Sequence, residues 1–473
     1  MLQLDRRLFL AGAAGSAIAA RAAAAGLKAP VAAPVPVNPV VKQRADAQVF
    51  LSEDGWYYLT GSVPEYDRLV LRRSRTIAGL ATAEERVLWR HLASGPLSGF
   101  IWAPEMHHID GKWVMYFAAG PSGGGEDVFR IRTWAVVCDG QDPMAGNWSV
   151  LGQFEAPWDS FNLDSTSFVH RGQRYFLWAQ REPGIETNSN LYLAPMASAL
   201  KLARKPVRLS IPTLDWEIQG FKVNEAPAVL ARNGRLFVTY SASATDARYC
   251  LGMLTVRDDV DLMDEKNWTK SPEPVFVSSS VTQVYGPGHN SFTVDERGRD
   301  VLVYHGRDYA EIKGDPLFDP NRHTRVQRIY YRADGTPDFG IPVGNGPVPD
   351  RFALPDAPES CIRHEGDAVV VGKGPIPSSQ WREVASPLGN GAVSLIPIDA
   401  PNRRLAALPD GRVTLVAAEG GPDSVRATAF VRHESGENRV RFTSATRPDV
   451  ALRHVGGALR AGSGTDGATF VIR

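Results

Sequence analysis

Short stretches of alternating apolar and polar residues run through most of the chain, and no run of three or more heptads occurs after the first forty residues. The stretches are rich in Tyr, Phe, Val and Trp and are bounded by Gly, Asp-Gly or Asn-Gly, as in 55–60, 111–117 and 234–240. Alternation with a period of two between such turn residues indicates β-strands joined by hairpins. The pattern therefore predicts an all-β protein.

A longer unit repeats five times, at intervals of about 60 residues. Each unit has a polar residue, an apolar strand, a turn and an aromatic strand. Five repeats of an all-β unit of this size predict a five-bladed β-propeller over residues 43–349, with the first strand of each blade lining the central channel. The residues at the head of the five units, which we expect to face the channel, are Asp46, Glu105, Asp164, Glu225 and His289.

The repeat becomes shorter after 347–350. Three segments beginning at Cys361, Arg404 and Ala451 are about 45 residues apart, and each is followed by a strand that opens with a large aromatic residue. Those aromatic residues are Trp381, Phe430 and Phe470. Three such units predict a β-trefoil over residues 350–473, in which each unit needs the other two to close the barrel.

The first 42 residues are predicted to be an export signal and a linker. A twin-arginine pair, Arg6 and Arg7, precedes an apolar run over 8–20 and a small-residue cleavage site at 20–22. This order is typical of a twin-arginine signal, whereas the apolar run is too short for a membrane span. An N-terminal helix of the mature fold is the alternative. The signal predicts a periplasmic or extracellular protein that is free of the membrane after cleavage.

Charge and cysteine content exclude several classes of function. The 473 residues include 52 Lys and Arg against 52 Asp and Glu, so a partner held by a strong field, such as nucleic acid, is not expected. Three widely spaced cysteines without a CxxC motif make neither a disulfide framework nor a zinc site. A neutral exported protein suits an uncharged sugar polymer as its substrate.

Four carboxylates and an imidazole on one axis are costly unless they have a use, because burial and like charges both disfavour ionisation. A turn or cap role is the simpler interpretation of any single one of them, but five at one repeat position favour a function. Opposed carboxylates suit glycoside hydrolysis, in which one protonates the leaving oxygen and the other activates water. Trp102, three residues before Glu105, would stack on a sugar or pack between blades.

The chain resembles glycoside hydrolase family 43 over about residues 43–345. The motifs that carry the resemblance are 44–46, 102–105, 164–168, 224–227 and 286–290. The resemblance implies a five-bladed propeller and an inverting mechanism. Asp46 would be the general base, Glu225 the general acid, and Asp164 the residue that holds Glu225 and tunes its pKa. Asp46 as a nucleophile is the minority reading.

Four further assignments concern the surroundings of this site. Trp102 and Glu105 are expected to bind substrate. The resemblance implies that Arg325 lies near the substrate pocket and that His289 lies near a central cation or water cluster, so we expect no required cofactor but allow for a structural calcium ion near the axis. The alternatives are a surface arginine and a satisfied core histidine.

The C-terminal part resembles the arabinose-binding trefoils of carbohydrate-binding module family 42. A pocket of that family uses a tyrosine, a histidine and an aspartate, and Cys361, Arg404 and Ala451 stand at the three tyrosine positions here. The third repeat, with His454 and Asp466, is the best candidate for a surviving pocket. A degenerate trefoil that only packs on the propeller is the alternative.

These observations predict an exported, monomeric, inverting hydrolase that releases terminal α-L-arabinofuranose from arabinan or arabino-oligosaccharides. A β-xylosidase or an arabinoxylan arabinofuranosidase of the same family is the alternative enzyme. A non-catalytic carbohydrate-binding propeller and a protein-interaction scaffold are the alternatives from other classes. Retention of Asp46, Asp164 and Glu225 together disfavours the carbohydrate-binding propeller, which needs no acid and base.

Overall fold

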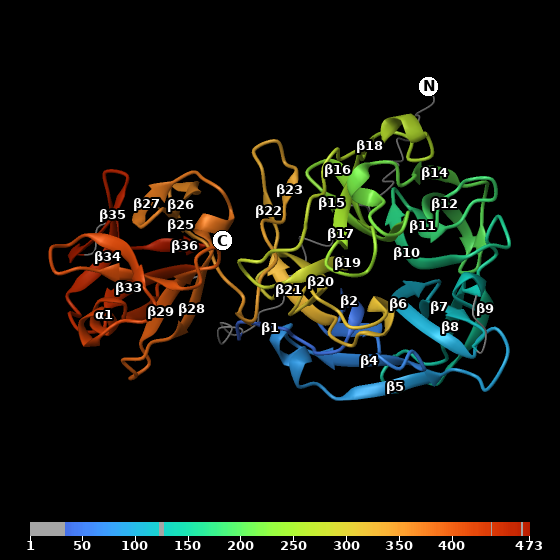
Figure 1. The fold of residues 1–473 in the computed structure, drawn as a ribbon, viewed down its shortest axis with the longest axis horizontal. Helices are drawn as coiled ribbons and strands as arrows, with labels where there is room; N and C mark the ends of the chain where they lie inside the picture. The colour runs from blue at the N-terminus through green and yellow to red at the C-terminus, as the bar shows by residue number, and fades with distance from the viewer. Residues whose placement is uncertain (1–33, 123–126, 437, 465–466) are drawn as a thin grey trace, which may run out of the picture.

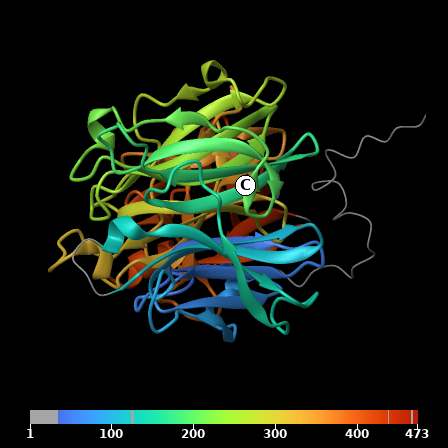
Figure 2. The same cartoon turned by 90° about the vertical axis from the view of Figure 1, so that its right-hand side faces the viewer.

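The computed structural model describes residues 34–122, 127–436, 438–464 and 467–473. Most of the predicted export segment and Asp466 therefore lie outside the described residues. The chain folds into two bodies that lie side by side, a larger one formed by the N-terminal three quarters and a smaller C-terminal one (Figure 1). Seen from the end of the larger body, the C-terminal strands lie behind its sheets (Figure 2). The all-β prediction is confirmed.

Five antiparallel sheets follow one another along the described part of the larger body, and their strands are in chain order except that β14 pairs with β12. The first sheet contains β2 (Ala45–Leu51), β3 (Tyr57–Ser62), β4 (Arg68–Ser74) and β5 (Glu85–Arg90), and the second contains β6 (Gly99–Ile109), β7 (Lys112–Gly120), β8 (Arg132–Cys138) and β9 (Trp148–Gln153). The third contains β10 (Asn162–His170), β11 (Gln173–Gln180), β12 (Asn190–Ser198), β13 (Lys201–Leu202) and β14 (Val207–Ser210). The fourth contains β15 (Asn224–Arg232), β16 (Arg235–Ala242), β17 (Cys250–Arg257) and β18 (Thr269–Lys270), and the fifth β19 (Tyr285–Val294), β20 (Asp300–Arg307) and β21 (His323–Arg328). These are the five predicted blades.

Tight turns join the first two strands of a blade where the sequence predicts hairpins. Asp110 and Gly111 have φ angles of 49° and 77°, and Asn233 and Gly234 have φ angles of 54° and 71°. Two successive left-handed residues define a type I′ turn, which matches the twist of the strands it connects. The Asp-Gly and Asn-Gly pairs are therefore turns for the expected physical reason.

An N-terminal segment closes the ring at the fifth blade. β1 (Val37–Asn38) pairs with β24 (Gly346–Pro347), and Val41 forms a bridge with Thr324 on the outer side of β21. The side chain of Asn38 donates to the carbonyl of Val326 at 2.9 Å and accepts from its N–H at 2.9 Å. The first and last blades are therefore held together by residues about 290 positions apart. A short hairpin of β22 (Tyr330–Tyr331) and β23 (Pro337–Asp338) follows the fifth blade.

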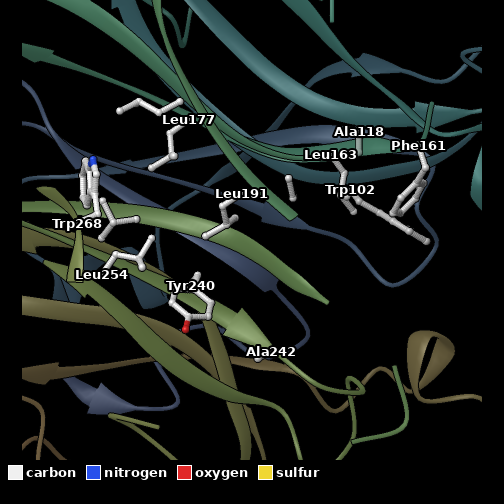
Figure 3. Packing of buried hydrophobic residues seen from close by; sticks show 14 of the residues in the cluster. Trp102, Ala118, Phe161, Leu163, Leu177, Leu191, Tyr240, Ala242, Leu254 and Trp268 are labelled. Atoms are coloured by element: carbon white, nitrogen blue, oxygen red, sulfur yellow. The ribbon is translucent and has the colours of Figure 1, made fainter. Parts of the chain in front are cut away.

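Apolar side chains of neighbouring blades pack against one another between the sheets. Figure 3 shows one such cluster, in which Leu177 and Leu191 of the third blade lie close to Leu254 and Trp268 of the fourth. Period-two strands with both faces covered by adjacent blades explain why so many residues of these strands are buried on both sides.

The C-terminal sheet has 12 strands and closes on itself through the pairing of β33 with β36. Its members are β25 (Phe352–Leu354), β26 (Ala357–Glu365), β27 (Ala368–Gly372), β28 (Trp381–Ala385), β29 (Val393–Pro397), β30 (Arg403–Ala407), β31 (Val413–Ala417), β32 (Phe430–Glu434), β33 (Arg439–Ser444), β34 (Val450–Val455), β35 (Ala458–Ser463) and β36 (Phe470–Ile472), with the helix α1 (Pro422–Ala427) between β31 and β32. Trp381, Phe430 and Phe470 open β28, β32 and β36, and all three are buried in one core. This threefold arrangement is the one expected for a β-trefoil. The boundary between residues 349 and 350 stays our interpretation.

Buried ion pairs connect the two bodies. Asp350 accepts from Arg328 at 2.9 Å and from Arg299 at 3.3 Å, and all three side chains are largely buried. The backbone of Asp350 also exchanges hydrogen bonds with that of Trp381. The guanidinium of Arg382 donates to the carbonyls of Gly344, Asn345 and Pro347. The start of the C-terminal sheet is therefore anchored on the fifth blade.

Candidate active site

A β-bulge lies near the start of the first strand in all five blades. The strand pairing is interrupted after Ala45, Trp102, Leu163, Glu225 and Gly288. The next residue in each case has a left-handed backbone, and these residues are Asp46, Ala103, Asp164, Ala226 and His289, with φ between 41° and 53°. Such bulges turn a side chain away from the sheet and are common beside active sites.

The bulges correct one part of the sequence interpretation. Asp46, Asp164 and His289 do share a repeat position, as predicted. Glu105 and Glu225 do not share it, because Ala103 and Ala226 occupy the equivalent places. Glu225 stands one residue before the left-handed position and Glu105 two residues after it. The prediction that all five residues share one repeat position is therefore wrong for these two carboxylates.

A cavity of about 580 Å³ opens where these strands begin. Asp46 on β2, Asp164 on β10 and Glu225 on β15 line it together with His289 on β19. Apolar side chains form much of the remaining wall; they are Trp102, Val128, Phe129, Phe161, Leu163, Phe221, Val223 and Leu317. Phe129 and Phe221 are 41% and 55% exposed, which places them at its mouth. The three carboxylates predicted to be catalytic are thus in one cavity.

The carboxylate of Asp46 contacts a hydroxyl group and a guanidinium group. The hydroxyl of Ser62 donates to Oδ2 at 2.6 Å, and Nη1 of Arg322 lies 3.5 Å from Oδ1. Burial alone would raise the pKa of Asp46, but the charge of Arg322 is the strongest influence in the other direction, and the pKa lies well below its ordinary value. Asp46 is therefore a carboxylate at neutral pH, which is the state that a general base needs.

Glu225 has the opposite protonation behaviour. Burial and the charge of Asp46 raise the pKa of Glu225 to about 7. The hydroxyl of Tyr249 donates to Oε1 at 2.8 Å and opposes that shift, because the bond favours the ionised form. A carboxyl group with this pKa still carries a proton in a large fraction of molecules near neutral pH, as a general acid must.

Asp164 is close enough to Glu225 and Asp46 for their charges to affect its pKa. Burial, followed by the charges of Glu225 and Asp46, raises the pKa of Asp164 well above its ordinary value. The backbone N–H of Ala226 donates a hydrogen bond to Asp164 and partly opposes the shift. Because Ala226 directly follows Glu225, this bond ties Asp164 to the strand that carries the candidate acid. The positioning role expected for Asp164 stays a prediction.

Two histidines approach Asp46. Nδ1 of His289 lies 3.4 Å from Oδ1 of Asp46 and 3.8 Å from Oδ2 of Asp164, and burial lowers the pKa of His289. His305, at the inner end of β20, accepts the backbone N–H of Asp46 at Nδ1 over 3.2 Å. Burial lowers the pKa of His305 to about 4, so its ring is neutral and Nδ1 is free to accept.

A metal site does not emerge from these groups. Within residues 34–122, 127–436, 438–464 and 467–473, no three His, Cys, Asp or Glu side chains are grouped so as to hold a metal ion. The calcium ion near the axis, and a part for His289 beside it, stay predictions.

Trp102 and Glu105, both predicted to bind substrate, have different positions. Trp102 lines the cavity, and its Nε1 is buried without a hydrogen-bond partner in the described structure. Glu105 does not line the cavity. It lies two residues further along β6 than Ala103, and its Oε2 is 3.1 Å from Nε2 of His107. Direct contact between Glu105 and a substrate in this cavity is therefore not supported.

Arg325 is also outside the cavity. It is fully buried in the middle of β21, where it donates to Asn345 at 2.7 Å and pairs with Asp308. Arg322, three residues earlier, is the arginine that lines the cavity and pairs with Asp46. Arg325 is neither the predicted pocket residue nor the alternative surface arginine.

The functional residues that the sequence did not suggest share a structural position. Tyr249 and Arg322 each stand one residue before the third strand of a blade, β17 and β21. In an up-and-down blade the third strand begins at the end where the first strand begins, so both residues reach the cavity. The predicted starts of the third strands could therefore have identified Tyr249 and Arg322 from the sequence.

The predicted sugar-binding residues of the C-terminal body are His454 and Asp466. Nε2 of His454 on β34 accepts the backbone N–H of Gly457 at 3.1 Å, and Asp466 is outside the described residues. In the first repeat, Nε2 of His364 lies 2.8 Å from Oδ1 of Asp399. Sugar binding by His454 and Asp466 stays a prediction.

The arrangement in the cavity can perform an acid–base reaction on a neutral substrate. One carboxylate is kept ionised, another is kept partly protonated, and apolar side chains form much of the wall around them. Residues 36–337 match the model of glycosyl hydrolases family 43. The chain belongs to glycosyl hydrolases family 43.

Several named relatives match most of the chain. An extracellular exo-alpha-(1->5)-L-arabinofuranosidase of Streptomyces avermitilis is 48% identical over 402 residues, which are 84% of this chain and 82% of the relative. The alpha-L-arabinofuranosidase 43 of Humicola insolens is 44% identical over 442 residues, 90% of this chain and 86% of that one. The crystal structure of an alpha-L-arabinofuranosidase from Lactobacillus brevis is 51% identical, with a TM-score of 0.64 over 66% of this chain and 98% of that chain.

The helices in the described part of the chain are too short or too polar to cross a bilayer. The twin-arginine signal lies in the segment outside the described residues and stays a prediction.

Proposed function

We propose that this family 43 hydrolase is an exo-acting α-L-arabinofuranosidase that removes terminal arabinofuranose from arabinan or arabino-oligosaccharides outside the cytoplasm. The observation that carries the proposal is the pair of opposite ionisation states in one cavity, Asp46 ionised beside Arg322 and Glu225 with a pKa of about 7. The names of the arabinofuranosidases from Streptomyces avermitilis and Humicola insolens support the choice of sugar.

In this mechanism the terminal sugar enters the cavity and its ring lies against apolar side chains such as Trp102 and Phe161. Asp46 accepts a proton from a water molecule as that water attacks the anomeric carbon. The bond from the anomeric carbon to the linking oxygen breaks, and this oxygen takes the proton of Glu225. Asp164 keeps Glu225 in place through the amide of Ala226. The configuration is inverted because water attacks directly.

Product analysis on linear arabinan tests the exo mode. Arabinose as the sole early product is expected, and a ladder of oligosaccharides would contradict it.

Glu225→Gln and Asp46→Asn should each lower arabinan hydrolysis by roughly 1,000-fold or more, since each removes one of the two groups on which the reaction depends. Unchanged turnover in either variant would contradict the proposal.

The inverting course has its own test. Added methanol should yield no methyl arabinofuranoside, because an inverting enzyme forms no covalent intermediate.

A further inference from the structure

A hydrogen bond joins Tyr249 to Glu225, the proposed acid. The tyrosine hydroxyl donates to Oε1 over 2.8 Å, and Tyr249 is 1% exposed in the wall of the cavity. Within the described residues Oε2 of Glu225 has no hydrogen-bond partner. The two oxygens of the same carboxyl group thus have different surroundings.

The ring of Tyr249 is fixed from two sides. It stacks on the imidazole of His305 with a centroid separation of 5.7 Å and an interplanar angle of 4°. On another side it occupies the space where residue 288 would carry a side chain, since a Cβ at Gly288 would be 2.3 Å from two of its ring carbons. The backbone N–H of Tyr249 donates to the carbonyl of Asp246 at 3.1 Å. The hydroxyl therefore cannot follow Glu225 if that side chain rotates.

The protonation state of Tyr249 fixes the direction of the hydrogen bond. Burial, together with the charges of Glu225 and Asp164, raises the pKa of Tyr249 well above its ordinary value, so the hydroxyl keeps its proton. Oε1 of Glu225 must then be the acceptor. A carboxyl group that accepts at one oxygen carries its own proton on the other.

We infer that Tyr249 is a positioning residue for Glu225, which accepts the tyrosine hydroxyl at Oε1 and delivers its proton to the leaving oxygen from Oε2. The inference rests on the proposed role of Glu225. The proton on Oε2 passes to the linking oxygen as the bond to the anomeric carbon breaks, and the electron pair of that bond remains on the oxygen. The negative charge that appears on Glu225 is met by the Tyr249 hydroxyl, which retains its proton throughout.

This contact favours the transition state over the bound substrate. A hydroxyl donates a stronger hydrogen bond to a carboxylate than to a neutral carboxyl group. The bond between Tyr249 and Glu225 therefore strengthens as the acid loses its proton, and only an interaction that strengthens in this way raises kcat.

The test is Tyr249→Phe, which keeps the ring between His305 and Gly288 and removes only the hydroxyl. We expect kcat on arabino-oligosaccharides to fall by roughly tenfold, the value typical of a lost hydrogen bond to a developing charge, with little change in KM. The alkaline limb of the kcat/KM profile should move up by roughly one pH unit, because the lost bond had favoured the ionised form of Glu225. An aryl arabinofuranoside with a strongly acidic phenol needs no proton and should react within about twofold of the wild-type rate.

Tyr240→Phe is the matched control. Tyr240 is an equally buried tyrosine of the same blade, and its hydroxyl donates to Glu217 at 2.8 Å outside the cavity. Its loss should lower Tm without moving the pH profile or the dependence on the leaving group. Identical behaviour of the two variants would overturn the inference, as would a Tyr249→Phe enzyme whose alkaline limb stays in place.

Glu225→Gln separates this inference from the function on which it rests. If Glu225→Gln hydrolyses arabino-oligosaccharides normally, the proposed acid itself is wrong. If Glu225→Gln reacts only with the strongly acidic phenol while Tyr249→Phe behaves like the wild type, Glu225 is the acid and the role of Tyr249 alone is refuted.

Discussion

Nη1 of Arg322 lies 3.5 Å from Oδ1 of Asp46, and both side chains are more than nine-tenths buried. Nη2 of the same guanidinium donates to the hydroxyl of Tyr66 at 2.6 Å, which fixes its orientation. This buried cation is the leading reason that the candidate base stays ionised despite its burial. The ionised state of Asp46 therefore depends on Arg322, which is not one of the three catalytic carboxylates that the sequence predicted.

Arg322→Met should remove that stabilisation. The pKa of Asp46 is expected to rise, so the acidic limb of kcat/KM should move toward neutral pH and activity at pH 5 should fall more than activity at pH 7. A loss of roughly 100-fold at pH 5 is expected for an uncompensated buried carboxylate. Arg325→Met serves as the control, because Arg325 is just as buried but pairs with Asp308 outside the cavity. An equal effect of both variants on the profile would contradict the assignment.

The pH dependence of the native enzyme follows from the two carboxyl groups. Glu225 must be protonated to act as the acid, and its pKa is raised to about 7, so kcat/KM should decline as the pH rises through this value. Asp46 must be ionised, and its pKa is held well below the ordinary range, so activity should persist below pH 4 for as long as the protein stays folded. Steady-state kinetics between pH 3 and 9 would check both limbs. A plateau that extends unchanged to pH 9 would be incompatible with Glu225 as the acid.

Trp102→Phe should weaken substrate binding. Nε1 of Trp102 is a buried donor without a partner in the described residues, on a side chain that lines the cavity, so a sugar hydroxyl is its natural acceptor. Loss of this donor should raise KM by about tenfold and leave kcat nearly unchanged. Trp134→Phe is the control, because its Nε1 is likewise buried without a partner but its ring packs in a cluster away from the cavity. A KM that changes in neither variant would show that Trp102 only packs between blades.

Asp350→Asn should destabilise the junction between the two bodies. Arg328 and Arg299 would each lose a buried carboxylate partner, which costs roughly 3 kcal/mol of unfolding free energy. Urea denaturation would measure the change, and the specific activity of the folded fraction should be unaffected because Asp350 is not in the cavity. Asp423→Asn, in an exposed pair with Arg426, should change the unfolding free energy by less than about 0.5 kcal/mol. Equal changes of unfolding free energy in the two variants would show that the buried ion pairs of Asp350 do not stabilise the junction.

Much of this architecture could be predicted from the sequence because its physical causes are local. Alternating apolar residues and turn pairs such as Asn233-Gly234 determine strands and hairpins, and their repetition gives the number of blades. Asp46 and Asp164 could be placed in the site because residues at repeated strand starts converge in a closed ring, and Glu225 because it stands next to such a position.

The remaining features depend on one-residue details that periodicity does not carry. Because of the bulge in β15, the residue equivalent to Asp46 in the fourth blade is Ala226 and not Glu225. Bulges of this kind depend on pairing between strands, which the sequence pattern does not reveal. The choice between Arg322 and Arg325 turns on where β21 begins, since only the residue before the strand faces the cavity. Tyr249 and His305 gain their roles only through a contact between two blades.

The pairing of residues 37–41 with β21 and β24 also sets an order of events during synthesis. This segment leaves the ribosome among the first residues of the fold, yet its partners near Thr324 and Pro347 are made roughly 280 to 310 residues later. The ring thus stays open until the fifth blade has emerged, and the cavity, whose wall needs Asp46 from the first blade and Arg322 from the last, cannot form earlier. A chain interrupted before residue 322 would carry both the base and the acid but no assembled active site.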